Sequence, residues 1–233
     1  AVNILIVGND ENPELSLPGR ADTIIVAHVD LAAPSLYFLS VPRDTRVEID
    51  GHGEDKLNHA FAYGGVLLLA ATVEQYLNIP IDYYAVTNFN GFESIVDVLG
   101  GVDIDVDKRM YYQTYDGLID IEAGPQHLNG KQALQYVRYR QDALGDITRV
   151  GRQQKLLKAL LDEAGEKGVL LKLPQLLAEV SKTVDTDLSL RQMVRLGLKL
   201  RSMDRQGLES DTLPGDFATI DGVSYWLGDR EAI

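Results

Sequence analysis

The pattern of apolar and polar positions predicts alternating strands and helices. Three β-rich runs, at residues 2–8, 23–30 and 35–41, are too apolar to face water on both sides. We therefore expect them to form central strands that are covered on two faces. Further strands are expected at 82–88 and 102–106, and in the late segments LESDTLPG and VSYWLG.

Longer periodic segments predict helices at 60–77, 90–101, 129–140, 151–164, 172–183 and 189–202. Three of these helices begin with a capping-box pair: Asn90 with Glu93, Asn129 with Gln132, and Ser189 with Gln192. Because no repeat, low-complexity tract or linker interrupts the pattern, the sequence predicts one α/β domain over residues 1–233. Its mixed, mostly central β-sheet is expected to be sandwiched between helix layers.

Composition narrows the classes of function. The formal net charge of −13 argues against non-specific nucleic-acid binding, so any anion site must be local. The absence of cysteine removes disulfides, thiolate catalysis and cysteine-based zinc sites. The longest apolar run, residues 66–71, is far too short to span a bilayer, and the chain opens directly on a strand. We expect a membrane anchor to precede it.

The stretch YVRYRQDALGDITRVGRQQ, residues 136–154, concentrates arginine in this acidic chain. If the preceding helix ends near Tyr136, Arg138 and Arg140 lie in extended chain and project the same way. Arg149 and Arg152 are three apart, as are Asp146 and Arg149, so they share a face at a helix start that favours anions. Arginine rather than lysine favours a phosphate or pyrophosphate site. The alternative is that these arginines pair with Asp142, Asp146 and Glu163 on the surface.

A second set of charged residues follows the predicted strands. Arg43 and Asp44, in SVPRDT, come directly after a buried strand, where open α/β sheets place ligands. Asp10 ends the first strand and Asp22 begins the second. Two carboxylates near several arginines suit a Mg²⁺–pyrophosphate arrangement. The alternative is that Asp10 is a turn residue and Asp22 a strand cap.

Several motifs in this order resemble the LytR-CpsA-Psr family: NILIVG, RADTIIVA, LSVPRDT, DKLNHAFAYGG, GGVDIDV, QHLNGKQALQYVRYR and RVGRQQ. The resemblance covers roughly residues 2–165 and the tail LPGDFATIDGVSYWL. It implies a Mg²⁺-dependent, membrane-anchored enzyme at the cell surface of mainly Gram-positive bacteria. Such an enzyme transfers a polyprenyl-pyrophosphate-linked glycopolymer, with one phosphate, to a hydroxyl of peptidoglycan.

The resemblance also implies roles for individual residues. The metal-binding aspartates fall on Asp10 and Asp22, and the phosphate-proximal glutamine on Gln153. The pyrophosphate-binding arginines fall on Arg43, Arg138, Arg140 and Arg149. The acceptor hydroxyl needs a base or an orienting carboxylate, for which Asp22, Asp44 and Asp146 are the candidates. Lys56 contacts sugar or phosphate, or is an ordinary surface lysine.

Other interpretations stay open. The apolar helices are either core helices or the walls of a tunnel for the polyprenyl chain. The histidines have no metal-ligand spacing, and we interpret them as structural. Two rival functions use the same residues: a lipid pyrophosphatase with water as acceptor, and a non-catalytic binder or regulator of lipid-linked intermediates.

Overall fold

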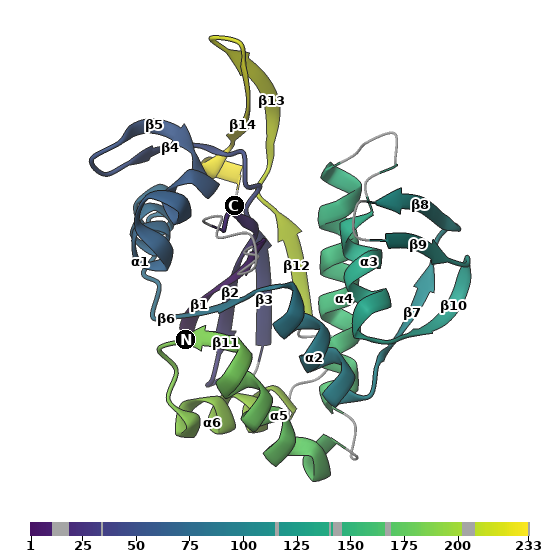
Figure 1. Ribbon diagram of the computed structural model, residues 1–233. Coiled ribbons are helices and arrows are strands. Elements are labelled where there is room, and N and C mark those ends of the chain that lie inside the picture. The colour runs from purple at the N-terminus through teal and green to yellow at the C-terminus, as the bar shows by residue number, and fades with distance from the viewer. Residues whose placement is uncertain are drawn as a thin grey trace. The chain divides into compact units, whose positions relative to one another are not determined.

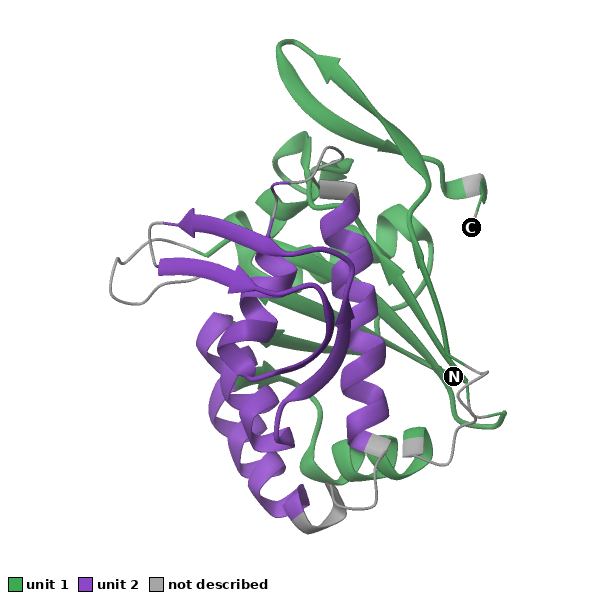
Figure 2. Ribbon diagram, turned by 90° about the vertical axis from the view of Figure 1, so that its right-hand side faces the viewer, with its two compact units in different colours: residues 1–88, 184–233 green, residues 89–183 purple. Residues whose placement is uncertain are grey.

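A computed structural model of the protein describes residues 1–10, 19–33, 35–114, 117–139, 141, 146–165, 169–201 and 208–232 (Figure 1). The chain forms two compact units, one of residues 1–88 with 184–233 and one of residues 89–183 (Figure 2). Each unit has its own hydrophobic core.

Unit 1, residues 1–88 and 184–233, is built on a six-stranded sheet in the order β11-β6-β1-β2-β3-β12. The strands β1, β2 and β3 form an antiparallel meander, whereas β6 runs parallel to β1 and β12 parallel to β3. The sheet is therefore mixed, as the sequence predicts. Its strands are β1 (Val2–Asn9), β2 (Ala21–Asp30), β3 (Ser35–Ser40), β6 (Tyr83–Thr87), β11 (Val184–Thr186) and β12 (Leu208–Thr212).

Two hairpins and two helices complete this unit. The hairpins are β4 (Arg46–Ile49) with β5 (Gly53–Lys56), and β13 (Gly215–Ile220) with β14 (Val223–Gly228), which extends away from the sheet in Figure 1. Helix α1 (Leu57–Leu77) packs on the sheet, and α6 (Leu190–Arg201) is joined to β6 by a hydrogen bond from Gln192 to the Tyr83 hydroxyl, 2.6 Å. A short 3-10 helix (Arg230–Ala232) follows β14.

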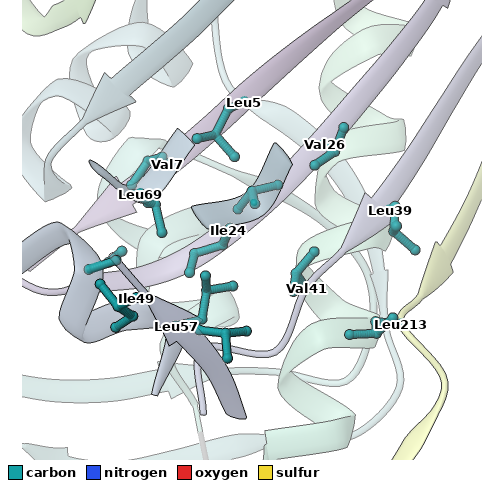
Figure 3. Close-up of a cluster of buried hydrophobic side chains, with 14 of the residues drawn as sticks. Leu5, Val7, Ile24, Val26, Leu39, Val41, Ile49, Leu57, Leu69 and Leu213 are labelled. Atoms are coloured by element: carbon teal, nitrogen blue, oxygen red, sulfur yellow. The ribbon is translucent and has the colours of Figure 1, made fainter. Parts of the chain in front are cut away.

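The core of unit 1 lies between the sheet and α1. Alternate residues of β1 and β2 meet helix residues there, as Figure 3 shows for Leu5, Val7, Ile24, Val26 and Leu69. In β2 the four residues 24–27 are all buried, so both faces of this strand are covered, as its unbroken apolar run predicts. Burial of such side chains supplies most of the favourable free energy of folding.

Helix α1 is long and apolar enough to cross a membrane by length and composition alone. One face of the helix packs on the strands of unit 1, where Leu57, Leu69 and Val73 are fully or almost fully buried. The other face is at the surface, with Leu67 71% exposed, and 22% of the apolar window is buried. The helix is kinked at Gly64 and Gly65, and Gly65 has φ +66°, a conformation that favours glycine.

Unit 2, residues 89–183, packs four helices with two small antiparallel sheets. Its core contains Val96, Ile104, Tyr136 and Leu156, each from a different element. The helices are α2 (Phe89–Leu99), α3 (Gly130–Arg138), α4 (Asp146–Gly165) and α5 (Val169–Thr183). The sheets pair β7 (Val102–Val106) with β10 (Gly124–Leu128), and β8 (Met110–Thr114) with β9 (Gly117–Ile121).

The structure confirms the α/β class and its central mixed sheet, and it corrects several local predictions. Helix α2 begins at Phe89, so Asn90 lies inside it and is not its N-cap. Helix α3 continues through Arg138, so this arginine is not in extended chain. The strands β4, β5, β8, β9, β10, β11 and β13 were not expected. The lipid tunnel, and the extent of one catalytic domain over residues 1–233, stay predictions.

Candidate functional site

The first group of candidate residues lies in the turn that follows β3. The first residues of α1 hold this turn through two backbone hydrogen bonds. The Leu57 N–H donates to the Thr45 carbonyl at 2.8 Å, and the Asn58 N–H donates to the Arg43 carbonyl at 3.0 Å. These two donors belong to the first turn of α1, where N–H groups have no partner within the helix. From the other side, the Trp226 N–H of β14 donates to the Asp44 carbonyl at 2.9 Å. The turn is therefore fixed by both α1 and β14.

Four charged side chains form a continuous chain around this turn. Arg43 Nη1 donates to Asp22 Oδ1, and Arg43 Nε lies 3.5 Å from Asp44 Oδ2. Asp44 also accepts from Lys56, with Nζ to Oδ1 at 2.8 Å. All four side chains are only 20–23% exposed, so solvent screens them less than a surface pair. The structure thus brings together four predicted residues of unit 1.

Asp10 directly follows β1, the strand next to β2, and lies at the same end of the sheet as Asp22. Its backbone N–H donates to the Arg20 carbonyl at 3.1 Å, and its Oδ1 accepts from the Arg20 N–H at 2.5 Å. The register between β1 and β2 shifts after Gly8, so Asp22 has no residue opposite it. Such a bulge re-aims side chains. Asp22 is therefore a bulge residue rather than the strand cap of the alternative interpretation.

The pair Asp10 and Asp22 fits a divalent ion in donor chemistry, because Mg²⁺ prefers carboxylate and phosphate oxygens. Within the described part of the chain, however, no group of three or more His, Asp or Glu side chains could hold a metal ion. Two carboxylates therefore suit an ion that also takes oxygens from a bound substrate.

In unit 2 the predicted arginines lie on α3 and α4. Arg138 is the last residue of α3, and its guanidinium carbon lies 4.6 Å from the ring centre of Phe89. Arg149 on α4 is only 5% exposed, and Gln153, four residues on, is half-buried on the same helix face. Arg140 and the side chain of Asp146 lie outside the described residues.

Arg152 has a role that the sequence analysis did not assign. It is 4% exposed, and its Nη2 donates to the Tyr139 carbonyl at 2.5 Å, just after the end of α3. The guanidinium also lies 5.5 Å from the Tyr139 ring centre. Arg152 thus fixes Tyr139, the residue that follows Arg138 at the end of α3. That both groups of residues bind one pyrophosphate stays a prediction.

A cluster around Asp55 was also missed. His59 Nδ1 and the Tyr63 hydroxyl each lie 2.8 Å from Asp55 Oδ2. Burial opposes ionisation of this carboxyl, but the hydrogen bonds from His59, Tyr63 and the Lys56 N–H outweigh it and lower its pKa. His59 and Tyr63 lie one turn apart on α1, and Asp55 lies four residues before His59 at the end of β5; this spacing is the signal that could have found the cluster.

Comparison with known proteins places this chain in a family. The chain is 36% identical over 236 residues to the polyisoprenyl-teichoic acid–peptidoglycan teichoic acid transferase TagU of Halalkalibacterium halodurans, covering 99% of this chain and 75% of TagU. The crystal structure of B. subtilis TagV matches with a TM-score of 0.88 and 29% identity over 99% of this chain and 91% of TagV. A structure of TagT bound to LI-WTA matches with a TM-score of 0.80 and 30% identity, over 99% and 85% of the two chains. Because the model of the LytR_cpsA_psr family matches residues 1–233, the chain belongs to that family.

Proposed function

We propose that this protein transfers a glycopolymer from a polyprenyl-pyrophosphate carrier, as a phosphodiester, to a hydroxyl of peptidoglycan. The observation that carries the proposal is the charged chain Asp22–Arg43–Asp44–Lys56 on a turn fixed at both sides. Support comes from family membership and from TagU, whose name describes transfer of teichoic acid to peptidoglycan.

In this reaction the acceptor oxygen attacks the phosphorus that carries the sugar. A new oxygen–phosphorus bond forms, the bond to the bridging oxygen breaks, and polyprenyl phosphate leaves. The acceptor proton passes to a carboxylate and then to solvent. Phosphoryl transfer depends mainly on positioning and charge neutralisation, so the protein's part is to supply fixed cations.

Arg43 and Lys56 are such cations. Asp44 contacts both, through different carboxylate oxygens, and so holds them at one place in the turn. Phosphate oxygens that approach the turn would replace carboxylate contacts of Arg43 and Lys56 rather than order two mobile side chains. This preorganisation lowers the entropic cost of binding. In unit 2, we assign Arg138, Arg140, Arg149 and Gln153 to the same substrate, with Asp22, Asp44 and Asp146 as the candidate proton acceptors.

A divalent ion is part of the proposal. Mg²⁺ held by Asp10 and Asp22 would add positive charge to neutralise the pyrophosphate. Asp10 and Asp22 each use Oδ1 for their protein contacts. We also propose a slot for the polyprenyl chain among the apolar helices, and a location at the cell surface with a membrane anchor.

The test is turnover of a polyprenyl-pyrophosphate-linked glycopolymer with peptidoglycan, followed by mass spectrometry of the products. We expect the phosphodiester-linked product with wild-type protein in Mg²⁺, its loss in excess EDTA, and its loss in Arg43→Ala and Asp22→Ala. Arg109→Ala is the matched control, because Arg109 is 53% exposed and pairs with Asp120 on another hairpin. A wild-type-like Arg43→Ala variant would contradict the proposal.

The same assay separates the rival functions. Release of lipid monophosphate or inorganic phosphate without peptidoglycan would identify a pyrophosphatase. Binding without any product would identify a binder or regulator. Full turnover in EDTA would remove Mg²⁺ from the mechanism while leaving the transfer reaction in place.

A further inference from the structure

We propose that Tyr225, together with Arg46, Lys56 and the nearby Tyr63, forms a binding surface for a sugar ring. This inference rests on the proposed function, because the sugar would belong either to the donor glycopolymer or to the glycan chain of the acceptor. All the residues that carry it lie in unit 1, beside the charged turn of Arg43 and Asp44.

The backbone holds Tyr225 at this turn. Its neighbour Trp226 forms a β-bridge with Thr45 and donates its N–H to the Asp44 carbonyl at 2.9 Å. Trp226 is itself 9% exposed and packs edge-on against Phe217, with ring centres 5.0 Å apart. Tyr225 therefore occupies a fixed position one residue from the anchor of β14.

Two cations lie over the Tyr225 ring. Arg46 and Lys56 are directly opposite each other in the β4–β5 hairpin, so their side chains share one face. The Arg46 guanidinium carbon lies 5.8 Å from the ring centre and Lys56 Nζ lies 5.9 Å from it. A group stacked in contact would lie only about 3.5–4.0 Å away, so neither cation is packed against the ring centre.

A second aromatic group lies at the start of α1. The rings of His52 and Tyr63 are stacked, with centres 4.3 Å apart and planes 13° from parallel. Tyr63 is 47% exposed although its hydroxyl is fixed by Asp55. The hydrogen bond to Asp55, followed by burial and the charge of Asp55, raises the pKa of Tyr63. Asp55 directly precedes Lys56 in β5, so Tyr63 is tied to the hairpin that also carries Lys56. Exposed, fixed aromatic faces are suited to the apolar face of a pyranose ring.

The charges of this surface are balanced rather than cationic. Arg46 pairs with Glu54 at 2.5 Å, Lys56 with Asp44, and His59 with Asp55. Each cation of this surface is thus matched by a carboxylate. Hydroxyl groups both donate and accept, and they match a surface that offers carboxylates and cations side by side. The composition of the surface therefore favours a neutral polyhydroxylated ring.

The protein provides its own reporter, because Trp226 is the single tryptophan of the chain and lies next to Tyr225. Two phosphate-free probes would be titrated against Trp226 fluorescence and by calorimetry: an N-acetylglucosamine tetramer, which represents the acceptor glycan, and the oligosaccharide cleaved from the donor. We expect one probe to bind wild-type protein, Tyr225→Ala to weaken its binding at least tenfold, and Tyr225→Phe to retain it. Tyr111→Ala is the matched control, since Tyr111 is a 61% exposed tyrosine of the β8–β9 hairpin.

Kinetics identifies the source of the sugar. A higher KM for peptidoglycan in Tyr225→Ala, with unchanged kcat, would assign the surface to the acceptor, and a higher KM for the lipid-linked substrate would assign it to the donor. Equal affinity of Tyr225→Ala and wild type, or no binding of either probe to wild-type protein, would overturn the inference. If transfer still depended on Arg43 in that case, the proposed function would stand without this surface.

Discussion

The pair of Arg43 and Asp22 allows a quantitative test of the charged turn. Arg43→Ala removes a charge-assisted hydrogen bond to Asp22 and a longer contact, 3.5 Å, to Asp44. In this variant Asp44 still has its ion pair with Lys56, in which Nζ and Oδ1 are 2.8 Å apart. Hydrogen bonds to charged groups contribute about 1.5–3 kcal/mol. Because both side chains are 21–23% exposed, we expect the free energy of unfolding to fall by about 2 kcal/mol, within that range.

A double-mutant cycle isolates the pair. Asp22→Asn keeps the side-chain volume and removes the charge, so it should cost a similar amount, and the double variant should cost clearly less than the sum. We expect a coupling energy of about 1–2 kcal/mol, within the range of residues in contact. Urea unfolding, with an unchanged m-value, measures each free energy.

The surface pair of Arg109 and Asp120, 53% and 40% exposed, provides the matched cycle, where coupling below about 1 kcal/mol is expected. If the effects of Arg43→Ala and Asp22→Asn add to within about 0.5 kcal/mol, the two residues are independent. The description of a shared charged chain would then be wrong, whatever the activity of the variants.

Two further predictions concern unit 2. Asn129 forms a complete capping box at the start of α3, in which its Oδ1 accepts from the Gln132 N–H at 2.9 Å. Asn129→Ala removes this cap and should lower the free energy of unfolding, measured in urea, by about 0.5–2 kcal/mol. Asn129→Ser keeps a capping oxygen and should retain most of that free energy. Hydrogen bonds to Asp103 and to the Gly100 carbonyl raise the pKa of His127 above its usual 6.5. Its contribution to stability is therefore complete below pH 6.5 and is lost as the pH rises through the higher folded-state pKa. In His127→Gln the melting temperature should depend less on pH across this interval than in the wild type. An unchanged pH dependence would mean that the pair of His127 and Asp103 does not contribute to stability.

The sequence was most informative where one strong local signal decides the structure. Residues 23–30 are apolar on both faces, and the structure buries this strand on both faces. The capping pairs at Asn129 and Ser189 form as predicted, because a side-chain oxygen and a nearby N–H need no distant partner. In the site, the position of Arg43 and Asp44 directly after a strand located the charged turn.

Other features depend on contacts between distant parts of the chain. The antiparallel direction of β1, β2 and β3, and the pairing of β12 with β3, are set by tertiary packing, which apolar runs do not specify. Arg138 would lie in extended chain if the helix ended near Tyr136, but α3 continues through Arg138 and is capped by Tyr139, whose carbonyl accepts from Arg152. The β13–β14 hairpin did have a local signal, because Asp221 and Gly222 adopt the positive φ angles, 51° and 80°, typical of a two-residue Asp-Gly turn.

The order of the strands has a consequence for the edges of the sheet. The outer strands β11 and β12 both come from the stretch after unit 2, yet they pair with β6 and β3, which are made much earlier. A sheet of the four earlier strands alone would have an open backbone edge at β6 and another at β3. Open edges of this kind are templates for association between chains, and closing them over a long sequence separation is slow. The short strands β11 and β12 therefore cover two edges that the rest of unit 1 would leave exposed.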